Sequence, residues 1–153
     1  IMVMTRKKLL QIVDQDKVKT AIEHAERQTS GEIRVSVAPL FWGNVEKAAD
    51  KAFVRMGMTN TKERNGVLFF VVPARRKFVV LGDRGIHERV GQDFWNSVAA
   101  AVSEKFREGD FTGGLLGGIQ KVGEQLATHF PYDASADKNE LSNTVDFGDD
   151  VKE

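Results

Sequence analysis

Six consecutive apolar residues, Val67 to Val72, constrain the fold of this chain more than any other feature. A run of this length without a polar residue is typical of a β-strand covered on both faces, so we expect it at the centre of a sheet. Pro73 to Arg76 interrupts the run, and Phe78 to Leu81 follows as a second strand. The four-residue connection predicts an antiparallel hairpin.

The remaining elements are predicted from their periodicity. Residues 32–37 alternate between polar and apolar side chains, which predicts a strand with one solvent-facing side. Helical spacing predicts helices over residues 16–29, 45–56, 94–106 and 112–130. This order predicts an α/β fold, a Rossmann-like three-layer αβα sandwich whose mixed sheet of about four strands is flanked by helices on both faces.

Length and composition limit the classes of protein. A chain of 153 residues fits one domain, and the absence of cysteine excludes thiol nucleophiles and cysteine-ligated zinc. Residues 133–153 hold seven acidic and two basic residues, so we divide the chain into an N-terminal extension (1–13), a domain (14–132) and an acidic mobile tail (133–153). Basic and acidic residues otherwise alternate, which argues against nucleic-acid binding.

No apolar run approaches the ~20 residues that cross a bilayer, and no secretory signal is apparent at the start of the chain. We therefore expect a cytoplasmic protein without a transmembrane segment. We also expect a monomer, because no exposed heptad pattern or long apolar patch is apparent.

The predicted topology brings oxygen-bearing side chains together. If the strand at residues 32–37 runs parallel to the central strand, Glu32 and Asn65 lie at the same edge of the sheet. The hairpin register places Gly66 opposite Asp83, and the segments that follow supply His87, Glu88 and Asp110. Carboxylate and amide oxygens are the ligands of Ca²⁺ and Mg²⁺, so one interpretation is a divalent-metal site. In the other interpretation, Asn65 and Asp83 serve turns, Glu32 is solvated, and Glu88 and Asp110 cap helices.

Four stretches resemble the TPM domain, a family with members in the thylakoid lumen and in association with a photosystem. They are Thr29-Ser30-Gly31-Glu32-Ile33, Arg64-Asn65-Gly66-Val67-Leu68, Leu81-Gly82-Asp83-Arg84-Gly85-Ile86 and Glu108-Gly109-Asp110-Phe111. The resemblance covers about residues 16–132. Within the family, the chain resembles a short, soluble bacterial subgroup. Much of the family has a glutamate where this chain has His87, so Glu88 is displaced by one position.

The resemblance implies an αβα sandwich and a metal, usually Ca²⁺ or Mg²⁺, bound at an acidic cluster. It assigns metal roles to Glu32, Asn65, Asp83 and Asp110, to which we add Glu88. It also implies an acid phosphatase activity proposed for plant lumenal members, and family members often carry an export signal and a C-terminal membrane helix. An exported or membrane-associated role is therefore left open beside the cytoplasmic one.

These observations leave two candidate functions. A third interpretation is a scaffold that binds neither metal nor substrate. The first function is a cation-binding or interaction module without catalysis. The second is a metal-dependent phosphatase in which Asp83 or Glu88 acts as general base and Arg84 neutralises the phosphate. We place the binding module first, because function depends on the site and not on the fold.

Overall fold

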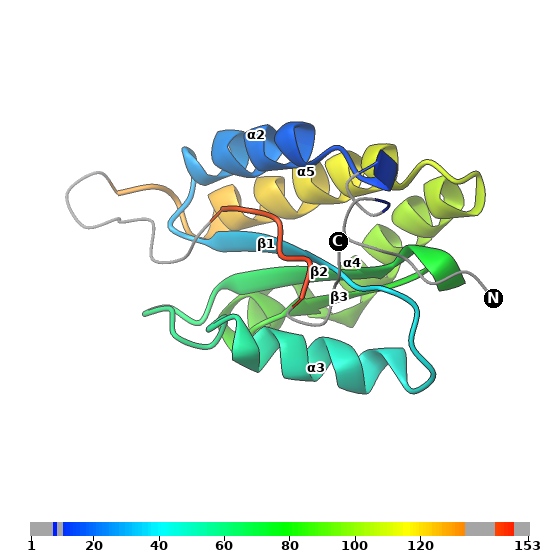
Figure 1. Ribbon diagram of the computed structural model, residues 1–153. Helices are drawn as coiled ribbons and strands as arrows, with labels where there is room; N and C mark the ends of the chain where they lie inside the picture. The colour runs from blue at the N-terminus through cyan, green and yellow to red at the C-terminus, as the bar shows by residue number, and fades with distance from the viewer. Residues whose placement is uncertain (1–7, 9–10, 134–142, 149–153) are drawn as a thin grey trace.

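A three-stranded mixed sheet forms the centre of the protein (Figure 1). The computed structural model describes residues 8, 11–133 and 143–148. Strand β1 (Glu32–Val37) pairs in parallel with β2 (Gly66–Val72), and β2 pairs antiparallel with β3 (Lys77–Gly82). The predicted central position of the apolar strand is confirmed, because β2 lies between the other two and all its residues are buried. The short 3₁₀ helix η1 (Pro73–Arg75) and left-handed Arg76 close the hairpin.

Helices lie on both faces of the sheet (Figure 1). Helices α2 (Gln15–Glu26), α4 (Arg84–Arg107) and α5 (Phe111–His129) cover one face, and α3 (Val45–Arg55) covers the other. Helix α4 is interrupted by a kink at Gly91 (φ +77°), so the predicted helix over residues 94–106 is preceded by a separate helical segment. None of the described helices is long and apolar enough to span a bilayer.

The alternation of side chains along β2 divides the core in two. Val67, Phe69 and Val71 pack with α2, α4 and α5, whereas the intervening residues pack with α3. Gly118 of α5 allows close packing on the sheet, because a Cβ there would lie 2.8 Å from the Phe69 ring. The predicted mixed α/β fold is confirmed.

Two expectations for the sheet were wrong. The described residues form three strands instead of about four, because the position beside β1 is taken by a C-terminal segment that forms only a single bridge, Asp146 to Ser36. The side of β1 predicted to face solvent is buried, and Glu32, Arg34 and Ser36 are each at most 2% exposed. Of the predicted acidic tail, the structure describes residues 133 and 143–148. The other residues of the tail lie outside the described part of the chain.

Candidate functional site

Glu32, Asn65 and Asp83 lie at one edge of the sheet, as predicted from the topology. Glu32 pairs with Gly66, and its N–H donates to the Asn65 carbonyl at 3.4 Å. The Asp83 N–H donates to the Gly66 carbonyl at 2.9 Å, which confirms the predicted hairpin register. The three residues are 2%, 1% and 7% exposed, respectively. The edge therefore gathers three buried oxygen-bearing side chains.

Asp83 is held from two sides. Its Oδ1 accepts the backbone N–H of Arg84 at 2.8 Å and thereby caps α4. The Arg64 guanidinium donates from Nε to Oδ2 at 2.6 Å and from Nη2 to Oδ1 at 2.9 Å. The hydrogen bonding to Asp83 raises the pKa of Arg64 above its ordinary value. The carboxylate is thus neutralised within the protein.

Gly85 allows the turn before β2 to approach the first turn of α4. Its N–H donates to the Arg64 carbonyl at 2.8 Å, and a Cβ there would lie 2.2 Å from the Glu63 carbonyl oxygen. Arg64 adopts a left-handed conformation (φ +51°), which is uncommon for a residue other than glycine. The turn is therefore fixed in the conformation that presents the Arg64 side chain to Asp83.

Asn65 joins this turn to the segment that precedes β1. Its amide nitrogen donates to Ser30 Oγ at 3.2 Å, and its backbone N–H donates to Thr61 Oγ1 at 3.2 Å. The Ser30 hydroxyl in turn donates to Glu63 Oε2 at 2.7 Å. The stretches before the two parallel strands are thereby connected, and Asn65 is fixed beside Glu32.

Glu32 also belongs to a buried ion cluster that the sequence analysis did not find. The Arg34 guanidinium donates to Glu32 Oε2 at 2.7 Å and to Glu26 Oε2 at 2.6 Å. The side chains of Glu32, Arg34 and Glu26 are 3%, 2% and 12% exposed, respectively. Glu26 also accepts the backbone N–H of Ile33 at 2.9 Å and so covers part of the free edge of β1. The alternation of residues 32–37 predicted that Arg34 faces solvent, so the only sequence signal for this cluster is the pair of opposite charges eight residues apart.

Burial raises the pKa of Glu26 above its ordinary value, although Arg34 and the Ile33 N–H act in the opposite direction. Two carboxylates face one guanidinium in this cluster, and Glu26 is its more accessible carboxylate. The cluster therefore takes up a proton more readily than an exposed glutamate.

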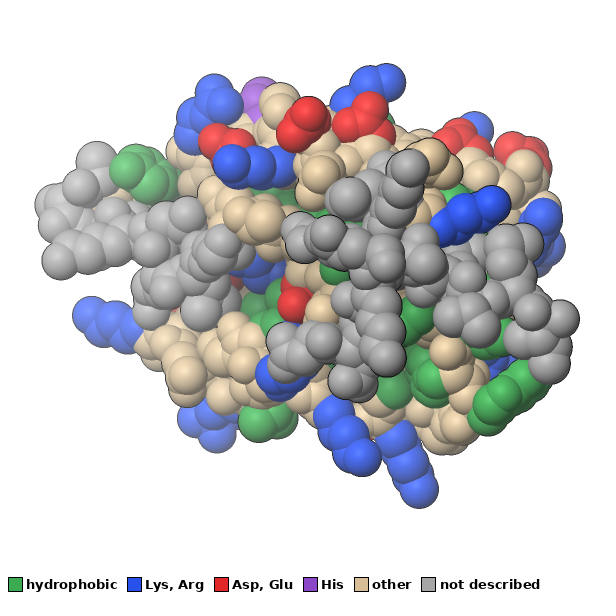
Figure 2. Space-filling model, viewed as in Figure 1, with side chains coloured by type: hydrophobic (Ala, Val, Ile, Leu, Met, Phe, Trp, Pro, Cys, Tyr) green, Lys and Arg blue, Asp and Glu red, His purple; other side chains and the backbone are tan. Residues whose placement is uncertain are grey.

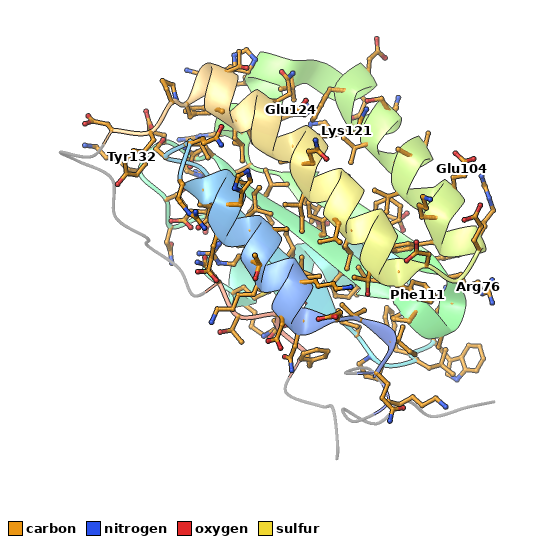
Figure 3. All side chains as sticks on the ribbon, turned by 90° about the horizontal axis from the view of Figure 1, so that it is seen from above. Arg76, Glu104, Phe111, Lys121, Glu124 and Tyr132 are labelled. Carbon is orange, nitrogen blue, oxygen red and sulfur yellow. The ribbon has the colours of Figure 1, made fainter. Side chains whose placement is uncertain are left out.

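Asp110 does not join the edge, contrary to expectation. It caps α5 by accepting the Gly113 N–H at 2.8 Å, and α4 separates it from Asp83. The Arg76 guanidinium at the hairpin donates to the Arg107 carbonyl at 2.7 Å, so the end of α4 lies at the hairpin end of the sheet. Figure 3 shows Phe111, the residue after Asp110, beside Arg76 and far from Tyr132. Tyr132 lies near the start of β1, where its N–H donates a hydrogen bond to the Gln28 carbonyl. The length of α4 places Asp110 at the wrong end of the sheet for a shared site.

The other candidates lie on the exposed first turns of α4. Arg84, His87 and Glu88 are exposed, and His87 Nδ1 accepts the Trp95 Nε1–H at 3.0 Å. Among residues 8, 11–133 and 143–148, no three or more Asp, Glu, His or Cys side chains are grouped to hold a metal.

The chemistry of the edge fits a hard cation, but both carboxylates already have a partner: Arg34 binds Glu32 Oε2, and Arg64 binds Asp83. The carboxylates of Glu32 and Asp83 and the amide oxygen of Asn65 are ligand types that Ca²⁺ and Mg²⁺ take. The Arg64 guanidinium covers both oxygens of Asp83, so a cation reaches that carboxylate only if Arg64 turns away. The Arg64 side chain is 31% exposed and can turn toward solvent.

Comparisons with known proteins give a family and a fold. The family model of the TPM domain matches residues 3–125. The NMR structure of the BA42 protein from the psychrophilic bacterium Bizionia argentinensis is similar, with 38% identity, a TM-score of 0.82, and coverage of 91% of this chain and 94% of that one. The N-terminal domain of the cg2496 protein from Corynebacterium glutamicum shares the fold, with 14% identity, a TM-score of 0.51, and coverage of 98% and 84%. No curated protein matches the chain.

Proposed function

The chain belongs to the TPM domain family, and we propose that it is a non-catalytic binding module for one divalent cation, Ca²⁺ or Mg²⁺. The proposed ligands are Glu32, Asn65 and Asp83. The observation that supports the proposal is the placement of these three buried oxygen-bearing side chains at one sheet edge by the strand register. Glu88 and Asp110 are not part of the proposed ligand set.

Binding replaces the single positive charge of Arg64 beside Asp83 with a divalent cation. In the metal-free protein, Arg64 neutralises Asp83, and a cation that takes its place leaves the carboxylate paired. The Arg84 N–H still caps the Asp83 side chain, so α4 keeps its first turn. The cation therefore changes the turn before β2 and leaves the sheet unchanged.

A titration of chelator-stripped protein with Ca²⁺ and then Mg²⁺, followed by amide NMR, tests this proposal. We expect saturable shifts at residues 32, 64–66 and 83–85, and an affinity at least about tenfold lower in Asp83→Asn, because one charged ligand is lost. Asp110→Asn is the matched control and leaves the affinity unchanged. The absence of localised shifts at millimolar metal would rule the cation site out.

A metal-dependent acid phosphatase is the second candidate. Arg84 and Glu88 are exposed and four residues apart, so they lie on one face at the start of α4, next to Asp83. Arg84 would neutralise the phosphate, and Asp83 or Glu88 would act as general base. An aryl phosphate assay on the titrated sample separates the two functions. A phosphatase gives metal-dependent turnover that Arg84→Gln lowers, whereas a binding module gives metal shifts without turnover.

A further inference from the structure

The free edge of β1 is covered by a segment from the other end of the chain. Residues 144–147, here called the C-terminal strap, run parallel to β1 (Figure 1, red). The Asp146 N–H donates to the Val35 carbonyl at 2.9 Å, and the Val37 N–H donates to the Asp146 carbonyl at 2.8 Å. An open strand edge is a template for pairing with another extended chain, and here the protein fills it with its own residues.

The side chains of the strap alternate in what they contact. Val145 and Phe147 are 5% and 7% exposed and belong to the core cluster of α2, α4 and α5. Asp146 points to the opposite side, as expected for successive residues of an extended chain. Its carboxylate accepts hydrogen bonds from Ser36 Oγ at 2.7 Å and from Arg55 at 2.7 and 3.1 Å. The edge therefore distinguishes a hydrophobic, an acidic and a second hydrophobic position.

The charge around this edge favours an acidic segment. Arg55 ends α3, and its side chain is 39% exposed, whereas Asp146 is 21% exposed. In the view of Figure 2, mainly lysine and arginine side chains project over the α3 side of the molecule, whereas acidic and basic side chains are mixed over α2 and α5. A segment with aspartate between two apolar residues matches both the apolar packing of Val145 and Phe147 and the positive charge of Arg55.

The contacts of the strap join residues far apart in the sequence. The ion pair with Arg55 spans 91 positions, and the hydrogen bond with Ser36 spans 110. The domain therefore binds the strap as it would bind a separate peptide, through backbone pairing and side-chain contacts. This is the arrangement of proteins that recognise a peptide by adding a strand to a sheet.

We propose that the β1 edge is a peptide-binding groove for extended segments with the pattern hydrophobic–Asp–hydrophobic, and that a partner protein carrying such a segment replaces the strap. The strap competes as a tethered ligand, because it belongs to the same chain as the edge that it covers. A partner segment therefore binds weakly unless it makes additional contacts or the strap is weakened.

The test uses the full chain and a peptide of residues 143–148, Asn-Thr-Val-Asp-Phe-Gly. Affinity is measured from amide shifts of Val35 and Val37 in the ¹⁵N-labelled protein. In the double variant Val145→Ser, Phe147→Ser, we expect the peptide to bind at least about tenfold more tightly than to the unchanged chain, because the tethered competitor is weakened. The Asp146→Asn peptide should bind several times more weakly than the parent peptide.

A charge reversal makes the test specific. Adding Arg55→Glu to the double variant should remove the preference for the acidic peptide, and an Asp146→Arg peptide should then bind more tightly than the parent. Equal affinities of the parent and Asp146→Asn peptides, or of the unchanged chain and the double variant, would overturn the proposal. If the double variant does not fold, the single variant Asp146→Asn replaces it, with the same expected direction.

The second copy of the chain is the competing occupant. Light scattering of the unchanged protein decides between the two. A monomer at all concentrations leaves the groove to a partner segment, as proposed. A concentration-dependent dimer that Arg55→Glu abolishes would assign the groove to the strap of a second copy. That result would contradict the proposal that a segment of another protein binds there.

Discussion

Arg64 and Asp83 face each other at the sheet edge and are joined by two hydrogen bonds of 2.6 and 2.9 Å. Arg64 comes from the turn before β2, and Asp83 comes from the junction between β3 and α4. The Asp83 carboxylate also caps α4, so it holds a turn, a strand end and a helix start together. A cation that binds Asp83 must therefore compete with the Arg64 guanidinium.

Removing Arg64 should therefore strengthen cation binding. We expect Arg64→Gln to raise the affinity for Ca²⁺ or Mg²⁺ by about two- to fivefold, because a partly exposed ion pair competes only modestly. Isothermal titration of the chelator-stripped proteins measures the difference. Arg84→Gln is the matched control, since it removes the same charge from an exposed neighbour whose hydrogen bond to Asp83 comes from the backbone. An equal gain in both variants would mean that general charge, and not the ion pair, limits binding.

Gly85→Ala should destabilise the protein by about 1–3 kcal/mol. The added Cβ would lie 2.2 and 2.6 Å from the backbone carbonyl oxygens of Glu63 and Arg64, and neither backbone atom moves without shifting the turn. Urea denaturation measures the loss. Gly117→Ala in α5 is the control, because a Cβ there meets no atom within 4 Å and alanine favours a helix, so that variant should gain about 0.5–1 kcal/mol. A stable Gly85→Ala protein would show that the turn is more adaptable than its contacts suggest.

The sequence could predict the centre of the fold because local patterns decide it. The apolar run of β2 has one plausible place, and the hairpin connection fixes the register that brings Asp83 opposite Gly66. The helix cap formed by Asp110 is also local, since its side chain accepts a hydrogen bond from the Gly113 N–H, three residues later. These predictions needed no knowledge of distant contacts.

The rest depends on contacts between residues far apart in the chain. The polar side of β1 looks solvent-facing in isolation, but Glu26 and the strap cover it, and Arg34 becomes buried. The misplacement of Asp110 has a similar cause. Its family resemblance suggested a site residue, but the length of α4 carries it to the hairpin end of the sheet. Neither the covering of β1 nor the position of Asp110 follows from local sequence patterns.

Arg34→Met should cost about 3–5 kcal/mol of folding free energy at neutral pH. The change leaves the carboxylates of Glu26 and Glu32 buried without the guanidinium between them. Adding Glu26→Gln should recover part of the loss, because it removes one buried charge and keeps an acceptor for the Ile33 N–H. Denaturation of the single and double variants measures the difference. No recovery in the double variant would mean that lost packing, and not buried charge, causes the cost.

The Arg34→Met deficit should also shrink on acidification. Burial raises the pKa of Glu26 in the folded protein, so the folded state binds a proton more readily than the unfolded one, and stability falls as the pH rises through the unfolded pKa toward the folded pKa. Loss of the Arg34 charge raises that pKa further, because the guanidinium acts to lower it. Denaturation at pH 5 and pH 7 should therefore show a smaller cost at pH 5, whereas a cost that is independent of pH would contradict the electrostatic explanation.

The strap should detach when the pH falls below about 4. Burial tends to raise the pKa of Asp146, but the hydrogen bonds from Arg55 and Ser36 outweigh it and hold the pKa below its ordinary value. Docking is therefore favoured by the ionised carboxylate. The contribution of the ionised carboxylate to docking is complete above the ordinary pKa of about 3.9 and is lost as the pH falls through the lower pKa of the docked state.

Amide exchange of Val37, whose N–H donates to the Asp146 carbonyl, should accelerate over this range relative to residues of β2. Asp146→Asn should abolish the pH dependence and exchange faster at neutral pH. Uniform exchange of β1 in both proteins from pH 6 to pH 3 would show that Val145 and Phe147 hold the strap without the ion pair.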